Sequence, residues 1–95
     1  MVNHRLVDVR RELEEGTVAS FLTRVRGGAP GQTITHVWIR EGRLVQSIEL
    51  RLGSPNWRTY SQKTLWRAGD WAVEARDNNG KVLARVEFRC VPARR

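Results

Sequence analysis

Cysteine, histidine and long apolar runs are all scarce in this chain of 95 residues. The single cysteine, Cys90, excludes an internal disulfide and every metal site that needs several cysteines. The two histidines, His4 and His36, lack the H-x-H or E-x-x-H spacing of metal ligands, so the sequence predicts neither a metal site nor a cofactor. No run approaches the roughly 18 apolar residues that a membrane span needs, and we expect no such span.

The remaining composition is that of a small soluble domain. The charged and hydrophobic fractions, 28% and 40%, are ordinary for a globular protein and disfavour disorder. The length favours a single domain, 1–95. Met1 leads into the polar Asn3, His4 and Arg5 rather than into the apolar region of a signal peptide. The chain as given is therefore expected to be cytoplasmic, or periplasmic if it is cut from an anchored parent.

Positive charge, in contrast, is abundant. Lys and Arg number 17 against 10 Asp and Glu, a net charge of +7, and all of the basic residues except Lys63 and Lys81 are arginines. Such an excess favours an anionic partner, for example nucleic acid, an acidic lipid surface or an acidic polymer. The basic residues are spread along the chain, however, so a generally basic surface without a dedicated site is the alternative.

Alternating and β-branched patterns predict strands along most of the chain. The expected strands are 4–13, 18–25, 33–40, 43–52, 57–65, 71–76 and 82–91. Glu41-Gly42 and the stretch 77–80 have the spacing and residue types of tight hairpin turns. A short helix over 7–15 is the competing interpretation of the first strand. About seven strands without a long helix indicate an all-β fold, an immunoglobulin-like antiparallel β-sandwich.

Alternation along the strands also predicts which side chains form the core. Along 43–52 one face is expected to carry Leu44, Ile48, Leu50 and Leu52, and the other face Val45, Ser47, Glu49 and Arg51. In the last strand Cys90 is expected to point into the core as a small apolar residue rather than to act as a nucleophile. The strand 33–40 is apolar on both faces, so it is either central and covered twice or exposes a patch for self-association.

A polar and aromatic stretch from Trp57 to Lys63 stands out from the other strands. Alternation puts Trp57 and Lys63 on one face and Arg58 and Tyr60 on the other. Trp57 is expected at the rim of the sandwich, where it closes the core or stacks on a sugar or base. Lys63 is expected at the edge of the core, with its ammonium in solvent or paired to a carboxylate such as that of Glu74 or Asp70. Arg58 is expected to point outward.

His36 lies in the middle of a predicted strand, on the same face as Trp38. It is either a general base or ligand, or a histidine at the edge of the core that is hydrogen-bonded across the sandwich. We find no carboxylate pair or nucleophile with a partner, so we expect no enzyme. The candidate binding residues are His36, Trp38, Trp57, Arg58, Tyr60, Ser61 and Lys63.

Several of these residues fall in runs that resemble a known family. Gly-Gln-Thr-Ile-Thr-His-Val-Trp over 31–38, Trp-Arg-Thr-Tyr-Ser-Gln-Lys-Thr over 57–64 and Gly-Asp-Trp-Ala-Val-Glu over 69–74 resemble the bacterial Domain of Unknown Function 2914. The resemblance covers the stretch 18–91 and implies a compact β domain, often envelope-associated, with no established activity. The residues that match its motif positions are His36, Trp38, Trp57, Arg58, Ser61 and Lys63.

Two functions of different classes follow from these observations. The leading hypothesis is a non-catalytic binding or assembly module of bacterial origin, which acts through protein–protein interaction or self-association. It is motivated by the doubly apolar strand and by Trp and Arg residues of the kind enriched at protein interfaces. The alternative is a basic module that binds an anionic polymer, nucleic acid or acidic glycan, through Arg58, Lys63 and a stacking Trp57.

Overall fold

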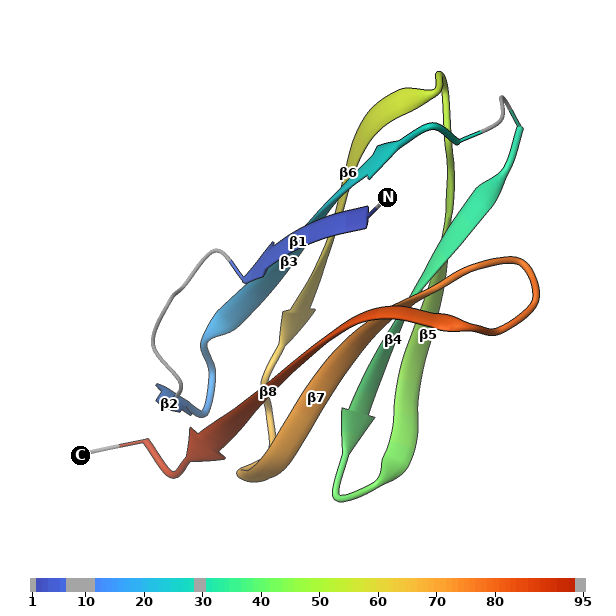
Figure 1. Ribbon diagram of the computed structural model, residues 1–95. Helices are drawn as coiled ribbons and strands as arrows, with labels where there is room; N and C mark the ends of the chain where they lie inside the picture. The colour runs from blue at the N-terminus through green and yellow to red at the C-terminus, as the bar shows by residue number, and fades with distance from the viewer. Residues whose placement is uncertain (1, 7–11, 29–30, 94–95) are drawn as a thin grey trace.

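The computed structural model describes residues 2–6, 12–28 and 31–93, and for 2–6 it describes the backbone alone. Within these residues the chain forms eight β-strands and no helix (Figure 1). No helix that could span a membrane is therefore found in the described part of the chain. The strands are β1 (Val2–Leu6), β2 (Glu12–Glu14), β3 (Val18–Arg26), β4 (Thr33–Arg40), β5 (Arg43–Arg51), β6 (Asn56–Thr64), β7 (Gly69–Arg76) and β8 (Val82–Val91).

The strands form two sheets, which lie in two layers (Figure 1). One sheet has three strands in the order β1-β3-β6, and the other has five in the order β2-β8-β7-β4-β5. Every pair of neighbouring strands is antiparallel except β2 and β8, which are parallel. Apolar side chains of both sheets fill the space between them, as in a β-sandwich. The predicted all-β sandwich is confirmed.

The first predicted strand, 4–13, is divided between the two layers. β1 pairs with β3 in the three-stranded sheet, whereas β2 pairs with β8 in the five-stranded sheet. The alternation of a sequence does not show which sheet a strand joins, so one continuous strand was expected. The competing helix over 7–15 is wrong for residues 12–14, which form β2; residues 7–11 lie outside the described part.

The core lies between the two sheets and includes aromatic side chains of both. Trp38 and Phe21 are the largest of the fully buried side chains. Trp71 stacks on Phe88 with the ring centroids 6.3 Å apart. Cys90 is 1% exposed, as predicted, and burial raises the pKa of its thiol, which keeps the thiol protonated at neutral pH. The chemistry of Cys90 is therefore that of a core residue.

The two predicted hairpin turns are both present. In the turn between β4 and β5, Glu41 and Gly42 have φ angles of 50° and 74°, as a tight two-residue turn requires. In the turn between β7 and β8, the Asp77 carboxylate accepts hydrogen bonds from the backbone N–H groups of Asn79 and Lys81, both at 2.9 Å. These turns fix the order β8-β7 and β4-β5 within the five-stranded sheet.

The prediction that Leu44 shares a face with Ile48, Leu50 and Leu52 is wrong, because β5 contains a β-bulge. The register pairs Trp38 with Gln46 but the next residue, Ile39, with Leu44, so Val45 has no partner of its own. Because of the inserted residue, the alternation of faces on one side of Val45 is reversed relative to the other side. Leu44 therefore faces outward with Ile39 and is 63% exposed.

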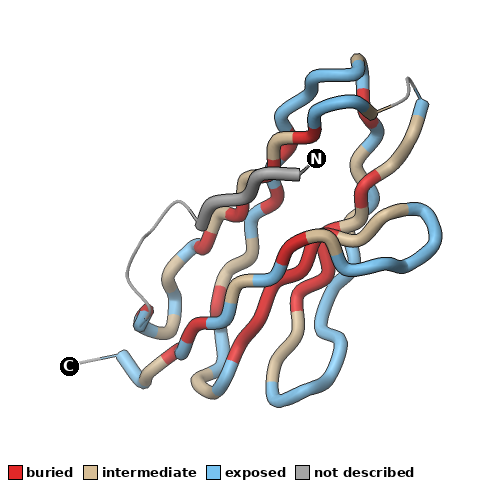
Figure 2. The backbone as a smooth tube through the Cα atoms, in the orientation of Figure 1, coloured by how far each residue is buried: buried red, intermediate tan, exposed pale blue. Residues whose placement is uncertain are grey.

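The doubly apolar strand is central and is covered on both faces. β4 lies between β7 and β5, and Val37, which faces away from the other sheet, is only 2% exposed. Its partner in register on β7 is Glu74, which is buried as well and binds both Arg76 and Arg85. Burial alone would raise the pKa of Glu74, but the hydrogen bonds and charges of the two arginines outweigh burial and lower it. Side chains of the sheet itself thus cover this outer face. Figure 2 shows the buried stretch along the neighbouring strand β7.

A hydrogen-bonded cluster, which we call the interlayer cluster, joins the two sheets inside the core. It consists of His36 and Trp38 of β4, Thr23 of β3, and Thr59 and Ser61 of β6, all of them buried. His36 Nε2 is 3.0 Å from Thr23 Oγ1, and His36 Nδ1 is 2.7 Å from Ser61 Oγ. Trp38 Nε1 donates to Ser61 Oγ at 3.1 Å, and the hydroxyl groups of Thr23 and Thr59 are 2.7 Å apart. The cluster contains no ionised group to balance a charge on the imidazole.

The neutral form of His36 satisfies this cluster. One ring nitrogen of a neutral imidazole donates and the other accepts, and each faces a hydroxyl group that can take the complementary role. Burial lowers the pKa of His36 from 6.5 to about 4, because a charged ring would lose its hydration without gaining a carboxylate partner. Among the described residues, no buried side-chain nitrogen or oxygen is left without a hydrogen-bond partner.

We predict that His36 makes the fold less stable as the pH falls from about 6.5 to about 4. The folded-state pKa lies below the unfolded value, so the unfolded chain takes up the proton first and gains stability relative to the fold. A shift of this size corresponds to a loss on the order of 3 kcal/mol. Urea unfolding of the wild type and of His36→Gln between pH 7 and 5 tests this expectation, with His4→Gln as the control. An unchanged pH slope in His36→Gln would contradict it.

We also predict that Ser61→Ala destabilises the fold by about 1–3 kcal/mol. The change removes the acceptor of Trp38 Nε1, a group that can only donate, and the partner of His36 Nδ1. Ser47→Ala is the matched control, because Ser47 is exposed on β5 and a surface change of this kind alters stability by about 0.5 kcal/mol or less. Equal midpoints of urea unfolding for the two variants would show that the Ser61 hydroxyl is dispensable.

Candidate functional site

The structure separates the seven predicted binding residues into distinct regions. His36, Trp38 and Ser61 belong to the interlayer cluster, and their side chains are 0–5% exposed. Ser61 and His36 have the separation of a nucleophile and its base, but both lie in the closed core, where a substrate has no access. Their hydrogen bonds across the sandwich match the structural interpretation of His36.

The other four predicted residues, which also lie on β6, differ in the face and in the end of the strand that they occupy. Arg58 and Tyr60 are exposed on the outer face of β6, as expected, because Thr59 and Ser61 between them point into the core. Trp57 lies at the rim, 41% exposed, and its indole packs so closely over Gly53 that a Cβ there would come within 2.7 Å of the ring.

Lys63 lies at the opposite end of β6 from Trp57, about 20 Å away at the rise of a strand. It is half-buried at the edge of the core, as expected. The expected pair with Glu74 does not form, because that carboxylate lies on the outer face of the other sheet and binds Arg76 and Arg85. Arg58, Trp57 and Lys63 are therefore not parts of one site.

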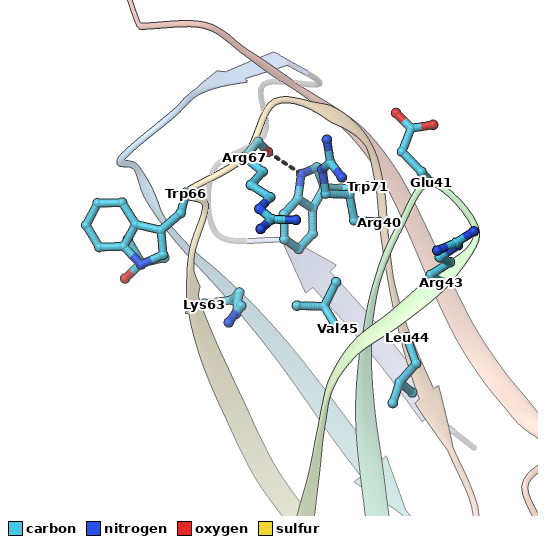
Figure 3. A pocket seen from close by; sticks show the side chains of 10 residues that line it. Arg40, Glu41, Arg43, Leu44, Val45, Lys63, Trp66, Arg67 and Trp71 are labelled. Atoms are coloured by element: carbon cyan, nitrogen blue, oxygen red, sulfur yellow. Dashed lines mark hydrogen bonds between the residues drawn. The ribbon is translucent and has the colours of Figure 1, made fainter.

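Lys63 instead lines a cleft, which we call the end cleft, between the β4–β5 hairpin and the segment that joins β6 to β7 (Figure 3). The cleft has a volume of about 680 Å³. Its lining residues are Arg40, Glu41, Arg43, Leu44, Val45, Lys63, Thr64, Trp66, Arg67 and Trp71. Figure 3 shows Val45, Lys63 and Arg67 directed into the space beside Trp71, while Leu44 and the indole of Trp66 lie at its margins.

The wall of the end cleft is rigid around Trp71. This residue is 4% exposed, stacks on Phe88, and donates a hydrogen bond from Nε1 to the Arg67 carbonyl at 2.9 Å. That hydrogen bond also fixes the backbone of the segment that carries Arg67. Trp66, next to it, is 73% exposed, which leaves a large aromatic surface open at the margin of the cleft. The cleft thus combines one fixed and one open indole.

Positive charge dominates the end cleft, with four basic side chains and a single carboxylate. Arg40 is anchored, since its Nε and Nη2 donate to the Ala68 carbonyl at 2.9 and 2.6 Å. The one carboxylate, that of Glu41, is engaged with the backbone N–H of Asp70 at 3.0 Å. No described carboxylate forms an ion pair with Arg43, Lys63 or Arg67. An anionic group in the cleft would meet these three cations.

The end cleft combines positive charge with aromatic surface. Its lining includes cations, aromatic surface and one threonine hydroxyl, and it includes no histidine or cysteine. Within the described part of the chain, no three His, Cys, Asp or Glu side chains gather as a metal site would require. The arrangement is suited to hold an anion next to apolar surface.

Sequence reasoning found Lys63 but missed Arg40, Arg43 and Arg67 as its neighbours. These residues are remote from Lys63 in the sequence, and only the strand order brings the β4–β5 hairpin beside the end of β6. The available signal was local: Arg43 directly follows the hairpin glycine, and Trp66-Arg67 directly follows the predicted strand 57–65. Neither fact reveals which other segment lies opposite.

Two solved structures resemble the fold. A β-glucosidase from Listeria innocua, solved in complex with glucose, superposes with a TM-score of 0.64 at 11% identity, covering 95% of this chain. This chain spans only 16% of that enzyme. A superoxide reductase (neelaredoxin) from Ignicoccus hospitalis superposes with a TM-score of 0.57 at 12% identity over 95% of this chain and 80% of its own. At such identities the likeness concerns the fold alone.

The sequence comparisons agree with the resemblance noted in the motifs. No curated protein has a matching sequence. The family model described as Protein of unknown function (DUF2914) matches residues 31–90, which extend from just before β4 into β8. They include every residue that lines the end cleft and all members of the interlayer cluster except Thr23. This match covers more than half of the chain, and the protein therefore belongs to the DUF2914 family.

Proposed function

We propose that this protein is a non-catalytic binding module of bacterial origin, and that its end cleft binds an acidic segment of a partner protein. The observation that carries the proposal is the set of three cations, Arg43, Lys63 and Arg67, that face one cleft without a described carboxylate partner. Charged side chains that converge on a cleft attract and orient a ligand of opposite charge.

A protein segment suits this cleft because its surface is apolar as well as basic. Leu44 and Trp66 are the most exposed of the large hydrophobic side chains, at 63% and 73%, and both lie at the cleft margin. Exposed apolar groups of this size commonly mark an interaction site. Trp and Arg side chains are also the residues most enriched among the energetic hot spots of protein interfaces.

The strand beside the cleft supports an extended segment as the ligand. β5 is the outermost strand of its sheet and pairs only with β4, so the hydrogen-bonding groups of its other edge face outward. A partner strand can pair with such an edge and gain main-chain hydrogen bonds. The side chains of an acidic strand on β5 would then alternate into and out of the cleft.

We expect a short synthetic peptide in which Glu alternates with Leu to bind the protein, and to bind more weakly as salt is raised. The double variant Arg43→Gln/Arg67→Gln should weaken binding about tenfold or more, as loss of interface hot spots does. The fluorescence of Trp66, at the margin of the cleft, reports the titration, and Trp66→Ala shows how much of the signal comes from this residue.

The matched control is Arg51→Gln/Lys81→Gln, which removes the same charge from exposed positions outside the cleft. The control should bind like the wild type. Equal weakening in the two double variants would indicate attraction by net charge alone and would contradict a site in the cleft. Equal binding of a peptide with Gln in place of Glu would also contradict the proposal. Sedimentation velocity of the protein alone distinguishes a foreign partner from a second copy of the chain.

A further inference from the structure

The outer face of the three-stranded sheet carries a second concentration of positive charge, remote from the end cleft. Phe21, Thr23 and Val25 of β3 are buried against the other sheet, so the residues between and after them face outward. The same alternation on β6 turns Arg58, Tyr60 and Gln62 outward. The cross-strand pairs on this outer face are Ser20 with Gln62, Leu22 with Tyr60, Arg24 with Arg58, and Arg26 with Asn56.

The central pair of this face brings two like charges directly opposite each other. Arg24 and Arg58 are partners in register, and Arg26 follows two residues later on the same face. Like charges in directly opposed positions destabilise a sheet. The charge of Arg26, then partial desolvation and the charge of Arg58, lower the pKa of Arg24, which agrees with this crowding. A bound anion would relieve the repulsion.

No acidic residue of these two strands offsets the arginines. Neither β3 nor β6 contains Asp or Glu. The side chain of Arg24 contacts the amide oxygen of Asn56 at 3.4 Å, a neutral partner. The other sheet shows the opposite arrangement, because its outward-facing Arg76 and Arg85 are bound to Glu74. The charges of Arg24 and Arg58 therefore meet no carboxylate within their own two strands.

An exposed aromatic ring lies next to the arginines. Tyr60 is 61% exposed. It lies two residues after Arg58 on the same face of β6, and it is paired in register with the half-buried Leu22 of β3. On its other side Gln62, which is exposed, donates a hydrogen bond from Nε2 to Ser20 Oγ at 3.0 Å. The face thus presents a flat aromatic surface with cations on one side and amide and hydroxyl groups on the other.

We propose that this outer face of β3 and β6 binds single-stranded nucleic acid, with Tyr60 stacked on a base and Arg24 and Arg58 in contact with the phosphates. Stacking on an exposed aromatic side chain requires a base that is not already stacked in a duplex. Arginine side chains match phosphate oxygens in geometry and charge. Amide and hydroxyl groups such as those of Gln62 and Ser20 can hydrogen-bond to base edges.

The location of this surface makes it independent of the proposed function. Arg58 and Lys63 point to opposite faces of β6, and Arg24, Arg58 and Tyr60 are not among the residues that line the end cleft. A single-stranded nucleic acid on the outer face and an acidic protein segment in the end cleft would therefore not compete for the same residues. The sequence had grouped Trp57 and Lys63 with Arg58 as residues that bind an anionic polymer. On the outer face, the neighbours of Arg58 are instead Arg24 and Tyr60.

Fluorescence anisotropy with a labelled single-stranded oligo-dT at several salt concentrations tests the proposal. Arg24→Gln/Arg58→Gln should weaken binding and reduce the slope of log K against log salt by about 1.4, the value for two phosphate contacts on a single strand. Tyr60→Leu should weaken binding about tenfold or more with little change in that slope, because stacking releases no counterions. Tyr60→Phe, which keeps the ring, should retain binding.

Two controls make the result specific to this face. Arg51→Gln/Lys81→Gln removes the same charge elsewhere, and Arg43→Gln/Arg67→Gln removes it from the end cleft; both should bind oligo-dT with near wild-type affinity. Duplex DNA of the same length and heparin serve as alternative ligands and should bind more weakly than oligo-dT. Equal loss in all three double variants would overturn the proposal, as would oligo-dT binding that is insensitive to Tyr60→Leu, or heparin binding as tight as that of oligo-dT. Thermal unfolding of each variant confirms that the fold is retained.

Discussion

The interlayer cluster is the constraint on which the rest of the molecule depends. His36 of β4 contacts Thr23 of β3 and Ser61 of β6, so a single imidazole connects the five-stranded sheet to two strands of the other sheet. Such a cluster is stable only if every member is satisfied, because an unpaired polar group in the core costs about 1–3 kcal/mol. The cluster therefore specifies the register of the layers more strictly than apolar contacts, which are not directional.

The orientation of β6 follows from this cluster. With Thr59 and Ser61 directed inward to make their hydrogen bonds, alternation turns Arg58 and Tyr60 outward and leaves Trp57 and Lys63 at the two inner ends. A shift of one residue would place Arg58 and Tyr60 in the core and expose the hydroxyl groups. The two proposed binding surfaces are thus consequences of the same buried hydrogen bonds. They include residues on opposite faces of β6, and the hydrogen bonds of Thr59 and Ser61 determine which residues occupy each face.

Much of the fold could be predicted from the sequence because its signals are local. Alternation located most strands, the glycine-containing turns located both hairpins, and Cys90 was placed correctly in the core. Leu44 was misplaced because the bulge at Val45 depends on how β4 and β5 pair, which alternation in a single strand does not reveal. The end cleft was not predictable for the same reason. Lys63 and Arg43 become neighbours only through strand order, a non-local property.

The distribution of charge bears on whether the net charge of +7 is merely a general property of the surface. On the outer face of the five-stranded sheet, Arg76 and Arg85 bind the buried Glu74, and Arg85 also contacts Glu87 at 3.0 Å. These arginines stabilise the sheet, because they cover its centre and neutralise a buried carboxylate. The arginines of β3 and β6 have no acid in their own strands, and the cations of the end cleft have a single, already engaged carboxylate beside them. Among the described residues, Arg24 and Arg58 lie on the same face as the exposed Tyr60, and the cations of the end cleft lie beside the exposed Trp66. Overall composition alone does not bring an exposed aromatic ring next to these basic side chains, so both places differ from a uniformly basic surface.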